Sequence, residues 1–298
     1  MTSRSPEYFS CDSSLAAGEP LVGKGTTGTR WLLLEADTPW PQRAIAEKEL
    51  PQGVTEKLVD FKGADQCRVQ FFRGDRSLSE GIRLMLARTD LVDRPLRCME
   101  LTSYEELLDL DLHRLFDEPV PPEEEHEPVI LVCTNGMRDP CCAREGTNFY
   151  QALAELDKQH VFQTTHLGGH RFAANVLWLP YGVYYSRLKP DQATELLELA
   201  GQEKILLSNL RGRVNLPKPA QAADHFLRQE GGWRGLHEVK FLSLEGEEPN
   251  WRASFKIEPA NETAEVEIAL EPEVFRVYKT TGDDELSLVG QYHCRYAS

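Results

Sequence analysis

The stretch that decides the fold is a short apolar run that ends in a cysteine-containing turn, Val129-Ile-Leu-Val-Cys133-Thr-Asn-Gly-Met-Arg-Asp-Pro-Cys141-Cys142. A second turn, His166-Leu-Gly-Gly-His170, follows later in the chain. Residues 129–132 have the length and composition of a buried strand, and residues 147–158 place apolar side chains on one helical face. Both turns therefore lie at the ends of regular elements of one small unit.

The remainder of this unit predicts a thioredoxin-like order. Residues 161–165 read as a strand, and residues 172–179 and 183–188 read as a hairpin turned at Gly182, where glycine permits a backbone that other side chains resist. Residues 190–201 read as a helix with proline in its first turn and glycine at its end. Strand, helix, strand, hairpin and helix indicate a thioredoxin-like domain over residues 129–201.

The flanking segments predict three further parts. Residues 1–118 form one α/β unit, after an irregular lead-in of some twenty residues; residues 119–128 are an acidic, proline-rich linker; residues 202–298 are a C-terminal α+β extension with no chemical motif of its own. Strands are expected at 29–35, 67–72, 81–87 and 96–101, and again at 238–244, 251–257, 264–270 and 275–280; helices are expected at 44–50, 104–116 and 220–229.

Charge and composition exclude several classes of protein. The chain has 298 residues and a formal net charge of −15, which argues against nucleic acid and anionic membranes, since both are bound by clustered Lys and Arg. There is no apolar stretch of membrane-spanning length and no export signal in the first ten residues, so a cytoplasmic location is expected. Seven cysteines are an odd number, which favours free thiols, metal ligation or redox work over a disulfide framework.

The candidate site consists of Cys133, Cys142, His166 and His170. Cysteine thiolates and neutral imidazoles suit zinc, copper and iron–sulfur clusters, whereas magnesium and calcium prefer oxygen ligands. Two cysteines and two histidines on neighbouring loops of one unit therefore predict a metal site. Structural zinc usually has a closer pair of cysteines, and here the only near pair is the adjacent Cys141 and Cys142.

Three of these segments, residues 133–142, 166–173 and 179–187, resemble the sucrase/ferredoxin-like family, a branch of the thioredoxin-like [2Fe–2S] ferredoxins. Four further segments, 11–14, 29–35, 210–217 and 279–284, are similar to the same family. We expect two tandem thioredoxin-like α/β domains, of which the first lacks a ligand set and is a scaffold or a docking surface for a partner.

The resemblance also implies a [2Fe–2S] cluster held by Cys133, Cys142, His166 and His170, with the two histidines at the spacing that a second cysteine pair has in other thioredoxin-like ferredoxins. Its function is then one-electron transfer or redox sensing with a redox partner protein, as an electron carrier rather than a catalyst. Imidazole ligands raise the potential of such a cluster. If their second nitrogens are exposed, we expect that potential to depend on pH.

Two alternatives remain. A Cys2His2 zinc site would make this a structural protein, and a thiol–disulfide oxidoreductase would use Cys141 and Cys142, although the C-x-x-C motif is absent. Secondary expectations concern residues around the site. We expect Arg138 and Arg171 either to donate hydrogen bonds towards the cluster or to pair with acids such as Asp139. A solvated loop or a basic docking spot is expected at Arg211 and Arg213. Packing roles are expected for Trp178, Tyr184 and Tyr185, and no partners are expected for Cys11, Cys67, Cys98 and Cys294.

Overall fold

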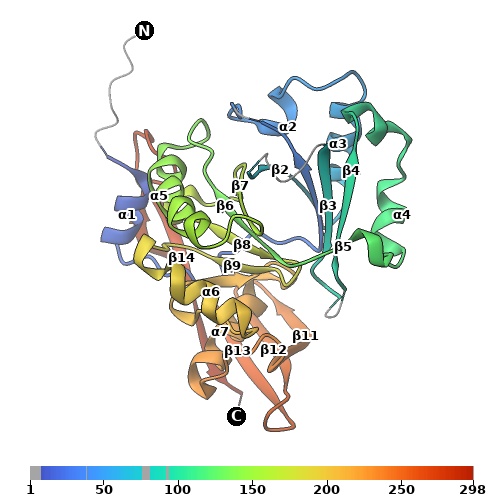
Figure 1. The fold of residues 1–298 in the computed structure, drawn as a ribbon. Helices are drawn as coiled ribbons and strands as arrows, with labels where there is room; N and C mark the ends of the chain where they lie inside the picture. The colour runs from blue at the N-terminus through green and yellow to red at the C-terminus, as the bar shows by residue number, and fades with distance from the viewer. Residues whose placement is uncertain (1–7, 38, 76–80, 92–93, 298) are drawn as a thin grey trace.

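The computed structural model describes residues 8–37, 39–75, 81–91 and 94–297. Its described elements form a ten-stranded mixed sheet in the order β10-β9-β8-β6-β7-β2-β1-β3-β4-β5, and a separate four-stranded sheet in the order β11-β12-β13-β14 (Figure 1). Residues 1–7, which hold most of the segment examined for an export signal, lie outside the described residues. Within the described part of the chain, no helix is both long and apolar enough to cross a membrane.

The second unit has the predicted thioredoxin-like topology. In chain order it contains β6 (Val129–Cys133), α5 (Pro140–Leu156), β7 (Val161–Thr164), β8 (Val176–Leu179), β9 (Val183–Tyr185) and α6 (Ala193–Gly201). Strands β6 and β7 are parallel, and β8 runs antiparallel to β6 on its other side. Helices α5 and α6 pack over one face of these strands through Phe149, Leu153 and Leu196. All five residues of β6 are buried, because both faces of this strand are covered.

The first unit repeats this topology. It contains β1 (Arg30–Glu35), α2 (Ala44–Glu47), α3 (Val54–Gly63), β2 (Cys67–Arg73), β3 (Ile82–Arg88), β4 (Leu96–Leu101), η2 (Tyr104–Asp109) and α4 (Leu112–Asp117). The helix expected at 44–50 is only one turn long, and the main helix, α3, was not predicted. Its buried residues Val54, Leu58 and Phe61 do have helical spacing. Three apolar positions after Pro51 and Gly53 are, however, a weak signal.

The two units are joined edge to edge into one sheet. Strands β2 and β7 hold the same place in their units and pair antiparallel, with Phe72 opposite Thr164. A second core, distinct from the ones under the helices, is shared by both units. It includes Trp31, Phe162, Cys133 and, from the start of α5, Cys142. The segment between the units contains the 3-10 turn η3 (Pro122–Glu124) and the short strand β5 (Glu125–His126), which pairs with β4. The candidate cysteines therefore lie at the centre of the molecule.

The C-terminal part adds one strand to the main sheet and builds the second sheet. Strand β10 (Leu210–Arg213) pairs with β9, and helix α7 (Lys218–Gly231) packs on β11 (Val239–Glu247), β12 (Asn250–Ile257), β13 (Glu262–Val277) and β14 (Ser287–Tyr296). Two predictions were wrong here. The strands expected at 264–270 and 275–280 are one strand, β13, with an irregularity between Glu271 and Phe275. Strand β14 was not predicted. The fold class, two thioredoxin-like units and an α+β extension, is confirmed.

The expected irregular lead-in is also corrected. Residues Ser10–Ala16 form helix α1, whose Ser10, Cys11 and Ser14 are buried against the second unit. Polar contacts and a disulfide hold this helix. Its sequence has no stripe of apolar residues at helical spacing, so the pattern of hydrophobic residues did not predict it. Figure 1 shows α1 beside the beginning of α5, with the C-terminal strands reaching up to both.

Candidate metal centre

The two cysteines meet because α5 begins directly over the end of β6. Pro140 is the first helical residue, and the Asp139 side chain caps the helix by accepting a hydrogen bond of 2.9 Å from the Cys141 N–H. One turn further along, Gly146 faces the end of β6, where an added Cβ would lie 2.0 Å from the Cys133 carbonyl oxygen. Only glycine permits this close approach, which brings Cys142 to Cys133.

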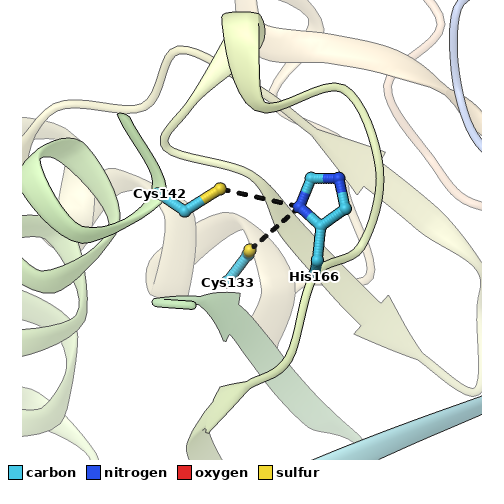
Figure 2. Close-up of side chains that lie close together, drawn as sticks. All are labelled: Cys133, Cys142 and His166. Atoms are coloured by element: carbon cyan, nitrogen blue, oxygen red, sulfur yellow. Dashed lines mark hydrogen bonds between the residues drawn. The ribbon is translucent and has the colours of Figure 1, made fainter. Parts of the chain in front are cut away.

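Three of the four predicted residues converge on one point, as Figure 2 shows. The His166 Nδ1 lies 3.9 Å from the Cys133 Sγ and 3.6 Å from the Cys142 Sγ. All three ligand atoms lie within 4.8 Å of one another. The pKa of the Cys133 thiol is held well below its usual value by a hydrogen bond from the Cys142 thiol and then by His166, whereas the pKa of Cys142 is raised by the same contact. One thiolate is thus stabilised within a buried pair.

The fourth residue, His170, lies beside this group. It begins the short 3-10 turn η4 (His170–Phe172), and its ring centroid is 5.2 Å from that of His166. Its Nε2–H donates a hydrogen bond of 2.7 Å to the Lys279 carbonyl oxygen. Its Nδ1 is buried and has no hydrogen-bond partner. Burial lowers the pKa of His170, against the effect of the Asp139 carboxylate 3.5 Å from its Nε2, and this favours the neutral ring. In the neutral ring that donates through Nε2, the Nδ1 carries a free lone pair.

These donors fit an iron–sulfur cluster or another thiophilic metal. The buried, unpartnered Nδ1 of His170 is costly unless it ligates something, and a neutral histidine that donates its other nitrogen to a carbonyl is the usual arrangement in metal sites. The Cys133 and Cys142 side chains are fully buried and His166 is half-buried. The residues that would hold such a group are Cys133, Cys142, His166 and His170.

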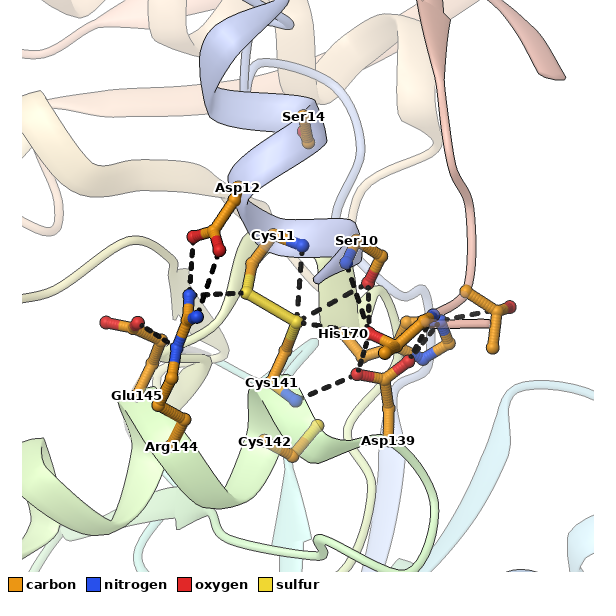
Figure 3. Close-up of a disulfide and its surroundings, with 12 residues drawn as sticks. Ser10, Cys11, Asp12, Ser14, Asp139, Cys141, Cys142, Arg144, Glu145 and His170 are labelled. Carbon is orange, nitrogen blue, oxygen red and sulfur yellow. Dashed lines mark hydrogen bonds and ion pairs between the residues drawn. A yellow bond between two sulfur atoms is a disulfide. The ribbon is translucent and has the colours of Figure 1, made fainter. Parts of the chain in front are cut away.

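A clamp from the C-terminal part closes the site from outside. The Asp139 carboxylate accepts hydrogen bonds of 2.9 Å from both the N–H and the Oγ1 of Thr281, besides that from Cys141 (Figure 3). Thr280 approaches His170 at 3.3 Å. The extension, expected to have no chemical motif, thus supplies groups that position the site. Both Thr280 and Thr281 lie in the segment 279–284, which stood out in the sequence only through the family resemblance.

Cys141 points away from the site and is bonded to Cys11, which the sequence analysis treated as unpaired. The two Cα atoms are 6.1 Å apart and the residues are 130 positions apart in sequence. Figure 3 shows that the disulfide joins α1 to the start of α5, with Arg144 bridging to Asp12. No local spacing could reveal a pair so distant in sequence. Cys141 and Cys142 consequently do not act as a vicinal pair in this structure.

Several secondary expectations change. Arg171 pairs with the buried Glu19, at 2.8 and 2.9 Å, and not with Asp139. Arg138 makes no ion pair within the described chain. Arg211 and Arg213 lie on strand β10, and Arg211 is only 4% exposed, so the expected solvated loop was wrong. The expected packing role of the aromatic residues is confirmed, since Trp178, Tyr184 and Tyr185 are all buried.

The chain is similar to several known proteins. A family model described as sucrase/ferredoxin-like matches residues 21–212. "Altered inheritance of mitochondria protein 32" from Meyerozyma guilliermondii is 31% identical over 98 residues, which are 29% of this chain and 35% of that protein. The chain therefore aligns with about a third of that relative's length.

Among solved structures, the thioredoxin-like [2Fe–2S] ferredoxin from Aquifex aeolicus is 24% identical, with a TM-score of 0.27, over 30% of this chain and 94% of that chain. A cysteine-to-serine variant of it is 21% identical, with a TM-score of 0.25, over 28% of this chain and 97% of that chain. The family assignment rests on the family model, which covers more than half of the chain and confirms the resemblance seen in the motifs. The chain belongs to the sucrase/ferredoxin-like family.

Proposed function

We propose that this protein carries a [2Fe–2S] cluster, bound by Cys133, Cys142, His166 and His170, and acts in one-electron transfer or redox sensing. The observation that carries the proposal is the group of two buried thiols and His166, together with the buried, unpartnered Nδ1 of His170, whose ring lies 5.2 Å from that of His166. When bound, such a cluster takes up and releases one electron, at a potential that imidazole ligands raise above that of an all-cysteine cluster.

The protein's own groups hold the ligands in place. The Lys279 carbonyl fixes the tautomer and the ring orientation of His170, and Gly146 fixes the separation of α5 from Cys133. The thiols are closed to water, whereas His166 is half-buried and faces a cleft. The second nitrogen of His170 is already bonded to the Lys279 carbonyl, whereas the His166 ring borders the cleft.

The cleft at His166 is the place where we propose that a redox partner protein docks. It has a volume of about 620 Å³ and lies between the second unit and helices α2 and α3 of the first. Four cationic side chains line it, and none makes an ion pair within the described chain: Arg43, Lys62, Arg68 and Arg138. No described lining residue is acidic, although the protein has a net charge of −15. The positive potential of the cleft attracts a partner with an acidic surface.

This arrangement gives the first unit a role despite its lack of ligands: we propose that its residues between 42 and 70 form the outer wall of the docking cleft. The division into units 1–118, 129–201 and 202–298, with the segment 119–128 as the linker between the first two, is part of the same proposal. The cytoplasmic location expected from the sequence likewise stays a proposal.

The decisive experiment is the visible spectrum of protein purified without oxygen, before and after dithionite. Sulfide-to-iron charge-transfer bands that bleach on reduction are expected, with loss or alteration of these bands in H170Q and H166Q. His237→Gln is a matched control, because His237 is exposed and lies outside the group of candidate ligands. The cluster would be rejected if fresh anaerobic protein has a featureless spectrum and contains less than one iron atom per chain.

One observation favours a second candidate, a structural zinc site. The distances of 3.6 and 3.9 Å from His166 Nδ1 to the two sulfurs would suit three ligands of a single tetrahedral ion. The protein would then be colourless and redox-silent, with one zinc per chain that survives oxygen. Metal analysis of anaerobic protein separates the two candidates.

A further inference from the structure

A second feature of the molecule is a cluster of positively charged side chains, buried or partly buried, that includes Arg171, the neighbour of His170 in the chain. The fully buried Glu19 carboxylate accepts hydrogen bonds from Lys24, at 2.7 Å, and from Arg171. Arg187 donates a hydrogen bond of 2.9 Å to Ser14, which itself donates to Glu19, and Arg211 lies against the same Phe172 ring as Arg171. Neither Arg187 nor Arg211 makes an ion pair within the described chain. Four cations thus share one carboxylate. Because unpaired buried charges are costly, this excess requires compensation.

The aromatic ring of Phe172 offers only part of that compensation. Its centroid lies 4.4 Å from Arg171, 4.6 Å from Arg211, 5.4 Å from Arg187 and 5.8 Å from Lys24. Cation–π contacts attract a cation but leave its charge in place, so the surplus of positive charge persists.

Of the four cations, Arg211 is the one that is almost fully buried. Like Arg187, it has a donor without a partner. Its side chain is 4% exposed, and its Nη1 donates to the Gly168 carbonyl, at 3.0 Å, and to Asn175. Its Nε is buried and has no partner. The guanidinium lies so close to Gly169 that an added Cβ there would be 2.2 Å from Nη2. The backbone therefore makes room for this cation beside the metal centre.

Arg211 lines a cavity of about 520 Å³ between residues 23–26, the η4 turn, β10 and the C-terminal sheet. Five cationic side chains line it, against a single carboxylate, that of Glu273. The five are Lys24, Arg171, Arg211, Lys218 and Lys279. This volume is that of a small-molecule site. Glycines and apolar side chains, including Phe172 and Tyr292, form much of the remaining wall.

We propose that this cavity binds a phosphate group, either as the inorganic anion or as part of a small phosphorylated molecule. A dianion matches a surplus of several cations better than a single carboxylate does, and the planar guanidinium fork suits phosphate oxygens. Arg171 adjoins His170, and Lys279 supplies the carbonyl that orients its ring. The occupant therefore lies next to the proposed metal centre, although its binding does not depend on the metal.

The test measures thermal unfolding of the full-length protein as purified, titrated with inorganic phosphate against chloride at equal ionic strength. A saturable rise in Tm specific to phosphate is expected. The rise disappears in Arg211→Gln. In Lys218→Glu, which changes an exposed residue at the rim, the apparent Kd weakens by about tenfold, as expected for reversing a charge in such a field. Lys240→Glu, an exposed change on β11 away from the cavity, retains the wild-type response.

Isothermal titration with inorganic phosphate and with adenosine 5′-monophosphate separates the two sources. Tighter binding of the nucleotide by tenfold or more identifies a phosphorylated organic molecule, and equal binding identifies the inorganic anion. The proposal is overturned if phosphate and chloride have equal effects, or if the phosphate response is the same in wild type, Lys218→Glu and Lys240→Glu. Lys218→Glu keeps the test decisive even if Arg211→Gln does not fold.

Discussion

The Nε2 of His170 lies 2.7 Å from the carbonyl oxygen of Lys279, 109 residues further along the chain. This bond leaves the Nδ1 of His170 free to act as a ligand, and it ties the candidate metal centre to the C-terminal extension. The same extension residues reach Asp139 at the start of α5. Part of the centre's rigidity is therefore expected to come from contacts between distant parts of the chain.

Asp139 is the residue through which this brace is best tested. Its buried carboxylate accepts three hydrogen bonds, and Asp139→Asn removes acceptors while keeping the shape. We expect a loss of about 1–3 kcal/mol in the free energy of unfolding, measured with urea. Asp191→Asn, an exposed change in η5 (Pro190–Gln192), is the control. Equal stability of the two variants would show that the clamp contributes nothing.

The adjacent cysteines are expected to respond differently to substitution. Cys142→Ser removes a thiol beside Cys133 and His166, so the visible absorption of anaerobic protein should be lost or strongly altered. Cys141→Ser breaks the bond to Cys11 but leaves the candidate ligands, so the absorption should remain. The reverse result would assign the second thiolate to Cys141.

The Cys11–Cys141 disulfide closes a long loop and holds α1 against the second unit. Cys11→Ser is expected to lower the free energy of unfolding by about 2–5 kcal/mol under oxidising conditions. The difference from wild type should vanish when both proteins are measured in excess dithiothreitol. A difference that persists in the reductant would indicate that Cys11 matters through packing instead of through the bond.

The cationic cleft at His166 predicts a charge-dependent electron exchange. Arg43→Glu with Lys62→Glu should slow oxidation of the reduced protein by the anion ferricyanide about tenfold at low ionic strength, because the local attraction becomes repulsion. Oxidation by cationic hexaammineruthenium(III) should quicken. The control pair Arg234→Glu with Lys240→Glu makes the same change in net charge at exposed positions outside the cleft. If both pairs alter the rates equally, net charge and not the cleft governs the exchange.

Glu19 should make stability depend on acid pH. Against the effect of burial, Arg171, Lys24 and Ser14 lower its pKa to about 2 from 4.5. A lowered folded-state pKa stabilises the protein above the unfolded value, and this contribution is lost as pH falls from about 4.5 to about 2. The shift corresponds to a contribution of about 3 kcal/mol near neutral pH. The free energy of unfolding of Glu19→Gln should therefore fall furthest below that of wild type near pH 6. The difference between the two proteins should become smaller below pH 4. A gap of constant size between these pH values, in urea titrations, would contradict this role for ionised Glu19.

Local sequence patterns determined much of the secondary structure and the candidate ligands. Apolar runs such as β6 and the turn at Gly182 are readable because alternation, helical spacing and glycine conformation act over a few residues. Cys133, Cys142, His166 and His170 stand out by residue type and spacing, and the motifs around them were enough to recognise the family.

Only the tertiary structure decided what brings these elements together. The pairing of β2 with β7, the bond from Cys11 to Cys141 and the contact of Lys279 with His170 join residues about a hundred or more positions apart. Such contacts depend on how both units and the extension pack together, and patterns over a few residues do not predict them. The charge excess around Glu19 arises in the same way, because its four cations come from separate segments that meet only in the folded protein.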